Sequence, residues 1–363
     1  MQTPGRRDLK GLVLAGGKGS RLRPLTATGA KQLVPVANKP VLFYALEQMV
    51  DAGITDIGII TGDTAAQVEA ALGDGSAFGA RFTFIRQEAP LGLAHAVATA
   101  APFLGHASFC MYLGDNFLKR GIASHVERFR TSGADAQILL KPVADPSALG
   151  VAVLDETGHV RRLVEKPAEQ VSNLAVIGVY FFPPEIHDIT PTLQPSDRGE
   201  LEITDAIQGL IDAGYTVEPS LIDDEWIDTG KKDDMLEANR VVLSTIERRV
   251  DGTVDARSTI SGEVVVEPGA EIVNSIVRGP AVIGTGARIE NAFIGPFTAI
   301  GDRCRIEGCE IEHSIVMCDS VVRNVGPRIS ESLIGKEVVV DRREEMPHTL
   351  TLMLGDHARV GLV

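Results

Sequence analysis

Cysteine is scarce in this chain, and the cysteines present form neither a metal-binding nor a disulfide pattern. The 363 residues include only Cys110, Cys304, Cys309 and Cys318, and no two of them make a CxxC pair. A structural zinc site is therefore not expected. The lack of a disulfide framework is typical of a reducing compartment, so we expect a cytoplasmic protein.

Excess positive charge and long hydrophobic runs are also missing. The chain has 35 Lys and Arg against 49 Asp and Glu, which gives a net charge of −14. Such an acidic chain offers no broad basic face to nucleic acid, so an anionic substrate must be held by local cations or by a metal. No run of about 18 apolar residues could span a membrane, and residues 1–8 are not followed by the apolar stretch of a signal peptide. We expect neither a nucleic-acid partner nor a membrane partner.

The first part of the chain alternates short apolar runs with helical patterns. Residues 12–15, 57–60, 82–85 and 109–113 read as buried strands, and helical patterns lie between them. This alternation indicates βαβ units, so we predict an α/β fold with a mainly parallel, Rossmann-like sheet over residues 9–232. Ligands of such sheets bind at the edge where the strands end.

A second rhythm follows a helical stretch that we place at residues 233–251. Aliphatic residues recur every six positions at Val254, Ile260, Val266 and Ile272, at Ile283 and Ile289, and at Ile294, Ile300 and Ile306. This hexapeptide repeat is typical of a left-handed parallel β-helix, which we predict over residues 252–340, with a tail over 341–363. The alternative is a set of strands with coincidental spacing. Flat β-helix faces associate by cyclic symmetry, so we expect a homo-oligomer, with a trimer or a multiple favoured.

A glycine-rich loop with nearby cations follows the first predicted strand. Residues 14–22 read LAGGKGSRL, and Lys31 comes shortly after them. Backbone N–H groups at glycines can cradle phosphate oxygens, although the loop is neither a Walker A loop nor a GxGxxG fingerprint. Arg21 and Lys31 suit a triphosphate whose charge grows on a leaving pyrophosphate. The alternative is a tight turn with solvated basic side chains.

The order of motifs along the chain resembles that of the sugar nucleotidylyltransferases. The matching segments are GGKGSRLRPLT at 16–26, KQLVPV at 31–36, KP at 39–40, Gln87, PLGLA at 90–94, LGDN at 113–116, EKP at 165–167, residues 176–180, RGELEITD at 198–205 and WIDTG at 226–230. The Lys31-Gln32 pair resembles the glucose-1-phosphate thymidylyltransferase branch, and the β-helix resembles its long form. The resemblance implies Mg²⁺-dependent transfer from dTTP to α-D-glucose 1-phosphate, giving dTDP-glucose and pyrophosphate. A UTP-dependent or modified-sugar enzyme and a catalytically silent sugar-nucleotide sensor are the alternatives.

The resemblance also implies a role for each matching residue. The catalytic cations would be Arg21, Lys31 and Lys166. The nucleotide would be bound by Leu14, Gly16, Gly17, Gly19, Ser20, Arg21, Gln32, Gln87, Pro90, Gly92 and Asp115. The sugar phosphate would be bound by Asn116, Gly150, Glu165, Lys166, Val176, Tyr180, Arg198 and Trp226. The Mg²⁺ ligands would be Asp115 and Asp228, although an Asp at the end of a strand can also cap a helix.

Four side chains carry further expectations. Gln87 offers a donor and an acceptor to a pyrimidine edge and would admit uracil as well as thymine. Arg198 would suit phosphate oxygens, and an ion pair with a neighbouring glutamate is its alternative. His95 is interpreted as a helix-start residue, because an anionic sugar phosphate attacks in line without a general base. His313 is interpreted as a surface or stacking residue of the β-helix, with acetyl transfer as the minor alternative.

Overall fold

The computed structural model describes residues 9–342, which fold into two compact units. The first unit holds residues 9–18 and 42–226, and the second holds residues 19–41 and 227–342. Residues 19–41 therefore belong with the C-terminal part of the chain, although they lie early in the sequence. The consecutive domain boundaries proposed from the sequence stay a prediction, and nearly all of the proposed tail lies outside the described residues. None of the helices within residues 9–342 is long and apolar enough to cross a membrane.

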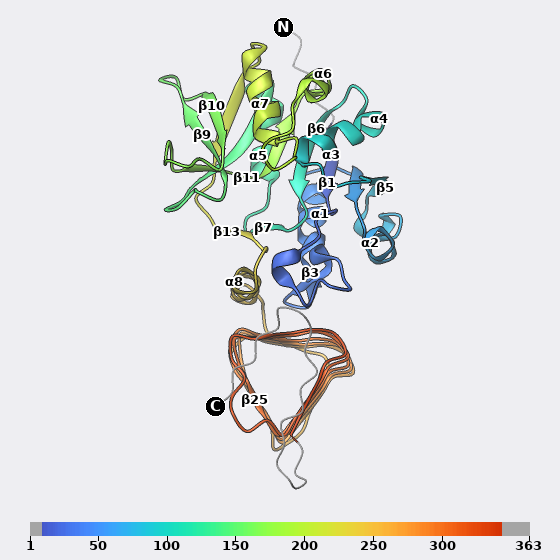
Figure 1. Ribbon diagram of the computed structural model, residues 1–363. Coiled ribbons are helices and arrows are strands. Elements are labelled where there is room, and N and C mark those ends of the chain that lie inside the picture. Colours follow the sequence, from blue (N-terminus) through green and yellow to red (C-terminus); the bar gives the residue numbers. More distant parts are fainter. Residues whose placement is uncertain (1–8, 343–363) are drawn as a thin grey trace. The chain divides into compact units, whose positions relative to one another are not determined.

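The first unit is built on a mixed sheet (Figure 1), which has nine strands within the described residues. Four of them run parallel in the order β5 (Arg81–Arg86), β4 (Asp56–Thr61), β1 (Leu9–Leu14) and β6 (Ser108–Leu113). Strand β11 (Leu174–Phe182) is antiparallel to β6, to β8 (Ala136–Pro142) and to β9 (Gly150–Leu154). Strand β10 (Val160–Glu165) is antiparallel to β9, and β12 (Val217–Leu221) is parallel to β8. The expected α/β fold is confirmed, and antiparallel strands extend its parallel half.

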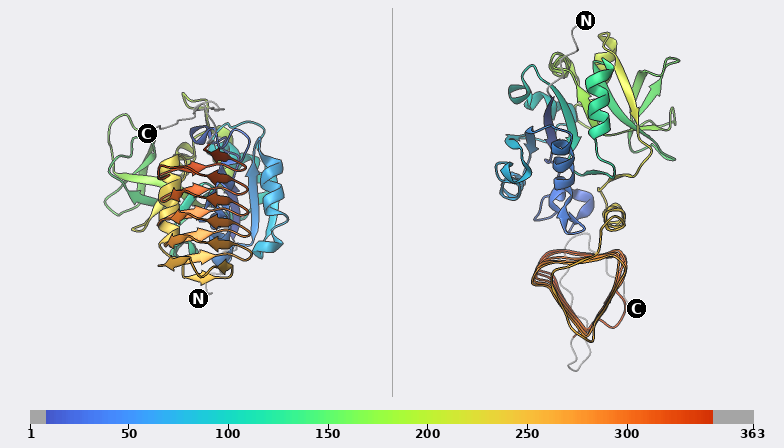
Figure 2. Two further views of the ribbon diagram at one scale, coloured as in Figure 1. Left: turned by 90° about the horizontal axis from the view of Figure 1, so that it is seen from below. Right: turned by 180° about the vertical axis from the view of Figure 1, so that it is seen from behind.

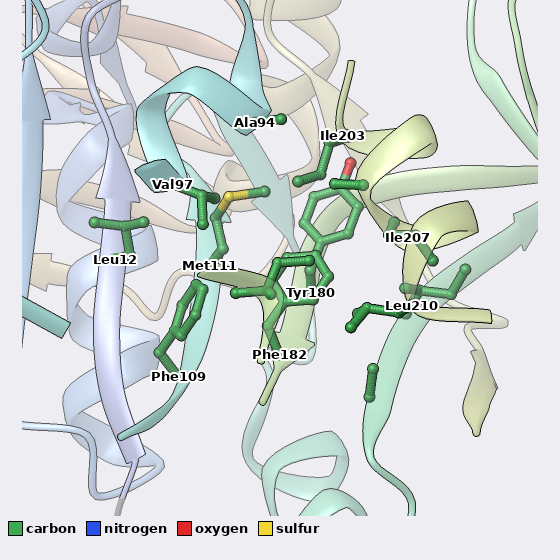
Figure 3. Close-up of a cluster of buried hydrophobic side chains, with 14 of the residues drawn as sticks. Leu12, Ala94, Val97, Phe109, Met111, Tyr180, Phe182, Ile203, Ile207 and Leu210 are labelled. Atoms are coloured by element: carbon green, nitrogen blue, oxygen red, sulfur yellow. The ribbon is translucent and has the colours of Figure 1, made fainter. Parts of the chain in front are cut away.

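Helices connect these strands and bury apolar side chains against the rest of the unit. They are α1 (Val41–Asp51), α2 (Ala65–Leu72), α3 (Leu93–Thr99), α4 (Ala101–Leu104), α5 (Ala123–Ser132), α6 (Ile186–Ile189) and α7 (Ile203–Asp212). In α7 the buried residues Ile203, Ala206, Ile207 and Leu210 recur at helical spacing, so they face the sheet as one stripe. Figure 3 shows this stripe beside core side chains of β6 and β11.

The strand order reverses beside β1, and this reversal defines a ligand-binding edge. After β1 the chain builds β4 and β5 on one side, and β6 then pairs with the other side. Leu14 and Leu113, the last residues of β1 and β6, are register partners. Open α/β sheets bind ligands outside the carboxyl ends of strands at such a switch point. The loops that leave it carry Gly16, Gly17 and Asp115.

The second unit contains a β-helix made of three parallel sheets, whose stacked coils are seen in Figure 2. The first sheet contains β14 (Arg249–Val250), β17 (Val264–Val266), β20 (Ala281–Ile283), β23 (Thr298–Ile300), β26 (Ile315–Val316) and β28 (Leu333–Ile334). The second contains β15 (Thr253–Val254), β18 (Glu271–Val273), β21 (Arg288–Glu290), β24 (Arg305–Glu307), β27 (Val321–Arg323) and β29 (Val339–Asp341). The third contains β16 (Thr259–Ser261), β19 (Ile276–Arg278), β22 (Phe293–Ile294) and β25 (Glu310–Ile311). The repeat residues stack inside: Ile272, Ile289 and Ile306 pair in register and are fully buried.

Helix α8 (Lys232–Leu243) precedes the β-helix and is shorter than the sequence pattern suggests. The helical stretch expected over 233–251 ends at Leu243, and Arg249 and Val250 already form β14, which pairs with β17. Two hydroxyl groups bond back to helix carbonyls at this end. The Ser244 hydroxyl donates to the Arg240 carbonyl and the Thr245 hydroxyl to the Val242 carbonyl, at 2.7 and 2.8 Å, and such local bonds compete with helix continuation.

Candidate active site

The glycine-rich loop and Asp115 leave the switch point of the first unit together. The Gly114 amide donates to the Leu14 carbonyl at 2.9 Å, and the Ala15 amide donates to Ile60 at 2.8 Å. These bonds tie the ends of three neighbouring strands, so the loops after β1 and β6 start from one rigid edge. Gly17 is exposed and Gly16 partly so, as a backbone phosphate cradle requires.

Asp115 is oriented by the residue that follows it. Asn116 is only 3% exposed, and its Nδ2 donates to Asp115 Oδ1 at 2.9 Å. Its Oδ1 accepts from Trp226 Nε1 at 2.6 Å, which settles the direction of the amide. Asn116 and Trp226 therefore hold one carboxylate oxygen of Asp115 in place. Their predicted contacts with the sugar phosphate stay predictions, and the sequence motifs carry no signal of this bridge.

Gln87 is held in one orientation by two acceptors. Its Nε2 lies 3.1 Å from the Gly92 carbonyl and 2.9 Å from Nδ1 of His95. A carbonyl can only accept, so the amide nitrogen must face it and Oε1 must point the other way. His95 then accepts through Nδ1 and carries its proton on Nε2. The helix-start residue thus orients the candidate base reader, a role that sequence reasoning missed.

Gly92 joins the base-reading segment to the segment around Leu201. Its φ is +104°, and a Cβ there would lie 2.4 Å from the Leu201 carbonyl oxygen, so no side chain fits. Two backbone bonds flank it: Leu201 donates to Leu91 at 2.7 Å, and Ala94 donates to Leu201 at 3.1 Å. The predicted base-reading and sugar-binding segments are therefore fastened to each other. Pro90 lies exposed beside them.

Glu165 lies at the centre of a polar cluster in the predicted sugar-binding region. Arg198 Nη2 lies 3.1 Å from Glu165 Oε1 and 2.8 Å from Oε1 of the buried Glu202. The Thr204 hydroxyl lies 3.3 Å from Glu165 Oε2. Both oxygens of Glu165 are thus oriented, and Gly150 leaves room for them, because a Cβ there would lie 3.1 Å from Oε2. Arg198 makes the glutamate pairs that the sequence left open as an alternative, and phosphate binding by Arg198 stays a prediction.

Val176 and Tyr180 belong to the hydrophobic core of the first unit. They are 7% and 4% exposed, and the Tyr180 ring stacks on Phe182 (Figure 3). Burial, with a smaller contribution from the charge of Glu165, raises the pKa of the Tyr180 hydroxyl well above its usual value. Their side chains support the site from within the core, and direct sugar contacts stay a prediction.

Lys166 has a strained backbone. Its φ is +41°, in the left-handed region that a residue with a side chain seldom adopts. The Lys166 amide donates to the Leu149 carbonyl at 3.1 Å, and its Nζ lies 3.7 Å from Glu165 Oε1. Such strain is kept where surrounding structure enforces it, often at functional sites. The conformation is consistent with the predicted catalytic role of the lysine.

In the second unit, Asp228 faces the two other predicted catalytic cations. Arg21 Nη2 lies 3.6 Å from Asp228 Oδ2, and Lys31 Nζ lies 3.7 Å from Oδ1. Lys31 is 6% exposed. Gly230 is required beside them, because a Cβ there would lie 2.5 Å from Arg21 Nη2. These side chains form one charged cluster, with Arg21 and Lys31 from the first motif segments and Asp228 from the last.

Three more predicted nucleotide-binding residues lie near this cluster in the chain. Gly19 has φ +62°, and its carbonyl accepts from the Thr26 hydroxyl at 2.6 Å, which closes the loop. Ser20 is exposed at the start of the 3₁₀ turn Ser20–Leu22. Gln32 is 2% exposed, and its Oε1 is buried without a hydrogen-bond partner among the described residues. An orphaned buried acceptor calls for a donor from outside the described chain, such as a ligand or water.

The predicted metal ligands, Asp115 and Asp228, are both carboxylates, and their binding of one shared metal stays a prediction. No group of three or more His, Cys, Asp or Glu within residues 9–342 could hold a metal by itself. Hard oxygen donors suit Mg²⁺, which proteins usually hold through one or two carboxylates together with water and substrate phosphates. The donor set therefore fits a metal that arrives with a nucleotide.

Known proteins are similar to this chain over most of its length. Residues 10–245 match the nucleotidyl transferase family. The chain is 53% identical over 351 residues to a glucose-1-phosphate thymidylyltransferase from Streptomyces griseus, covering 97% of this chain and 99% of the relative. A Bacillus anthracis protein assigned as a glucose-1-phosphate thymidylyltransferase, solved in complex with a sucrose, gives a TM-score of 0.60 at 36% identity and covers 64% of this chain and 94% of its own. A UDP-glucose pyrophosphorylase complexed with UDP-glucose gives 0.59 at 26%, covering 65% and 98%. The chain therefore belongs to the nucleotidyl transferase family, and its similarity to the Streptomyces relative extends through the β-helix.

Proposed function

We propose that the protein is a Mg²⁺-dependent glucose-1-phosphate thymidylyltransferase, which converts dTTP and α-D-glucose 1-phosphate into dTDP-glucose and pyrophosphate. The near-full-length similarity to the Streptomyces enzyme is the main support. The charged side chains that this chemistry requires are all present, with Lys31 and Arg21 facing Asp228 and Lys166 beside Glu165. Nucleotidyl transferases generally use a divalent metal, and the carboxylates of Asp115 and Asp228 are its proposed ligands.

The proposed reaction is one direct displacement. A phosphate oxygen of the sugar phosphate attacks the α-phosphorus of dTTP, and the bond to the bridging oxygen breaks, so that pyrophosphate leaves with the electron pair. The glycine loop binds the triphosphate through backbone N–H groups, while Arg21 and Lys31 neutralise the charge that grows on pyrophosphate. Lys166 holds the sugar phosphate, whose existing charge makes a general base unnecessary. Bound Mg²⁺ would neutralise part of the triphosphate charge.

The orientation of Gln87 supports recognition of a pyrimidine that has a proton on N3. With Nε2 turned to Gly92 and His95, Oε1 is the atom left to accept from a base. Thymine and uracil carry the N3–H donor, whereas cytosine has an acceptor at N3 and would face Oε1 without a hydrogen bond. UTP is therefore the second candidate substrate, and the fold similarity to a UDP-glucose pyrophosphorylase favours the same alternative.

Glucose recognition is proposed for the cluster around Glu165. A carboxylate whose two oxygens are fixed by Arg198 and Thr204 presents acceptors to sugar hydroxyl groups in a defined direction. Removing one hydroxyl of the sugar would remove the hydrogen bond that it donates to one of these oxygens. A preference for glucose 1-phosphate over other hexose 1-phosphates is the expected consequence.

Pyrophosphate release tests the proposal. Purified protein is mixed with Mg²⁺, glucose 1-phosphate and one of dTTP, UTP, dCTP or ATP. We expect the fastest release with dTTP, slower release with UTP and little with dCTP or ATP. Release that is fastest with UTP would support the uridylyl alternative. Nucleotide binding without release under any combination would identify a sugar-nucleotide sensor and contradict the proposal.

A homo-oligomer, with a trimer or a multiple favoured, remains part of the proposal. Its support is the β-helix, whose flat sheets can repeat around a symmetry axis. Light scattering of the full chain measures the mass directly. A mass equal to one chain at micromolar concentration would contradict it.

A further inference from the structure

A tight hairpin turn in the second unit is fastened to the β-helix by side-chain amides. The turn is made by Ala37 and Asn38, between β2 (Pro35–Val36) and β3 (Lys39–Pro40), and both residues have left-handed backbones with φ +47° and +64°. The Ala37 amide donates to Asn239 Oδ1 at 2.9 Å. Asn239 Nδ2 donates to the Phe297 carbonyl at 3.0 Å, and Asn38 Nδ2 donates to the Ile300 carbonyl at 2.7 Å.

The amide of Asn239 satisfies two backbone groups that differ in kind. Asn239 lies on α8 and is fully buried. Its oxygen must face the Ala37 N–H, and its nitrogen must face the Phe297 carbonyl, so the orientation has no alternative. Leucine can meet neither partner, and aspartate can meet only the donor. Each failure leaves a buried backbone polar group unpaired.

An apolar cluster lies at the same junction. Leu243 and Ile246 pack against Val265 and Val282, which point outward from β17 and β20, and Ala37 and Phe297 complete the cluster. The Phe297 ring also lies 5.1 Å from the His313 ring at a tilted angle of 43°, so His313 contacts an aromatic ring without stacking on it, and its surface or stacking role stays a prediction. Because the Asn239 side chain is itself fully buried, water does not compete for its hydrogen bonds.

Two short stretches of chain connect this junction to the charged cluster, one from Lys31 to the turn and one from Asp228 to α8. Lys31 precedes Ala37 by six residues, and the chain between them is braced by the bonds Val34 N to Lys31 O at 3.1 Å and Val41 N to Val34 O at 3.2 Å. On the α8 side, Asp228 precedes the first residue of the helix by four positions. Helix α8 thus begins shortly after Asp228 and holds, through Asn239, the hairpin that follows Lys31.

We propose that Asn239 is a positioning residue for Lys31, and that the β-helix holds Asn239 in place through the Phe297 carbonyl. The inference rests on the proposed function, because it assigns Lys31 to the triphosphate. Asn239 fixes the hairpin to Phe297 and thereby sets where Lys31 stands relative to Asp228. The β-helix then contributes to nucleotide binding through this contact, in addition to any role in assembly.

The test uses the full-length chain and three variants of the junction. Asn239→Leu removes both hydrogen bonds, and Asn239→Asp keeps only the bond from Ala37. Asn38→Gly removes the bond to Ile300 without straining the left-handed turn, so it should fold even where an Asn239 variant does not. Val322→Ala is the matched control, because Val322 is fully buried inside the β-helix and its truncation lowers stability without touching the junction. Asn173→Asp, at an exposed site, controls for added charge.

Three quantities are measured well below each unfolding midpoint: the Kd for dTTP with Mg²⁺, kcat and KM for pyrophosphate release, and hydrogen exchange of residues 31–41. We expect Asn239→Leu to weaken dTTP binding about tenfold, to raise KM for dTTP more than KM for glucose 1-phosphate, and to speed exchange at 31–41. Asn239→Asp and Asn38→Gly should show smaller changes of the same sign. Val322→Ala should lower the midpoint and leave all three quantities unchanged.

A lowered midpoint for the junction variants with unchanged Kd, KM and exchange would show that Asn239 serves stability alone, and would overturn the proposal. Failure of the proposed function looks different. Wild-type protein would then release no pyrophosphate from dTTP, while the exchange of residues 31–41 would still report whether Asn239 holds the hairpin.

Discussion

Removal of the Gln87 side chain tests how the nucleotide base is read. Gln87→Ala deletes the amide that Gly92 and His95 orient, and leaves both of those partners in place. The proposed hydrogen bond from N3–H of thymine to Oε1 is then lost. We expect weaker use of dTTP, while the dependence on Mg²⁺ should not change because Gln87 is not a proposed metal ligand.

The size of the effect follows from one unpaired donor. A buried polar group left without its partner costs about 1–3 kcal/mol, which corresponds to a fall of about 5- to 150-fold in kcat/KM for dTTP. Uracil has the same N3–H, so UTP should lose a similar factor and the dTTP to UTP ratio should stay constant. For dCTP the variant removes an acceptor that opposes N3, so the dTTP to dCTP ratio should fall.

The assay is pyrophosphate release at saturating glucose 1-phosphate with dTTP, UTP and dCTP. Gln170→Ala is a matched control, because Gln170 is exposed and outside the motif segments. His95→Ala provides a second arm: it removes one of the two acceptors that orient Gln87, and a partial loss with dTTP is expected. An unchanged kcat/KM for dTTP and an unchanged ratio to dCTP in Gln87→Ala would refute the assignment of Gln87 to the base.

Three further predictions concern the metal, the reaction course and the thiols. Asp115→Asn and Asp228→Asn should each lower kcat by orders of magnitude at ordinary Mg²⁺ concentrations, and near-full kcat in both variants would contradict their assignment as ligands. Protein mixed with α-labelled dTTP alone should retain no label on a denaturing gel, because the displacement is direct, and a labelled protein band would show a covalent intermediate instead. Burial raises the pKa of the Cys304 and Cys309 thiols to about 11, so little thiolate exists at pH 8 and native alkylation should be slow; fast native labelling in a mass spectrum would contradict this burial.

Repetition made the β-helix predictable in detail. Each coil must place an aliphatic residue inside, so the same spacing recurs many times in the sequence. A spacing that recurs so often seldom arises by chance. Ile272, Ile289 and Ile306 were expected to point inward on spacing alone, and they form one buried column. The strands of the first unit were predictable for a related reason, since a buried parallel strand needs a continuous apolar run.

Other features depend on contacts that sequence spacing does not record. The membership of residues 19–41 in the second unit comes from bonds such as Ala37 to Asn239, between residues 202 positions apart. The early end of α8 was not predicted, because the helical pattern continues past Leu243 while the hydroxyls of Ser244 and Thr245 turn back to helix carbonyls. In both cases polar side chains make bonds at the feature concerned, and polar side chains have no periodic signature.

The candidate site also contains residues that the sequence reveals and residues whose role depends on contacts in the fold. Motif resemblance finds the groups proposed to touch substrate, such as Gln87, Asp115 and Glu165, because the chemistry fixes their identity. It does not find their orientation, which comes from His95 for Gln87 and from Trp226, through Asn116, for Asp115. An orienting residue needs only the right donor or acceptor in the right place, so several residue types can meet its requirement. Substitution of an orienting residue should therefore cost less than loss of the group it holds, and its cost should be reduced by any replacement that offers the same hydrogen bond.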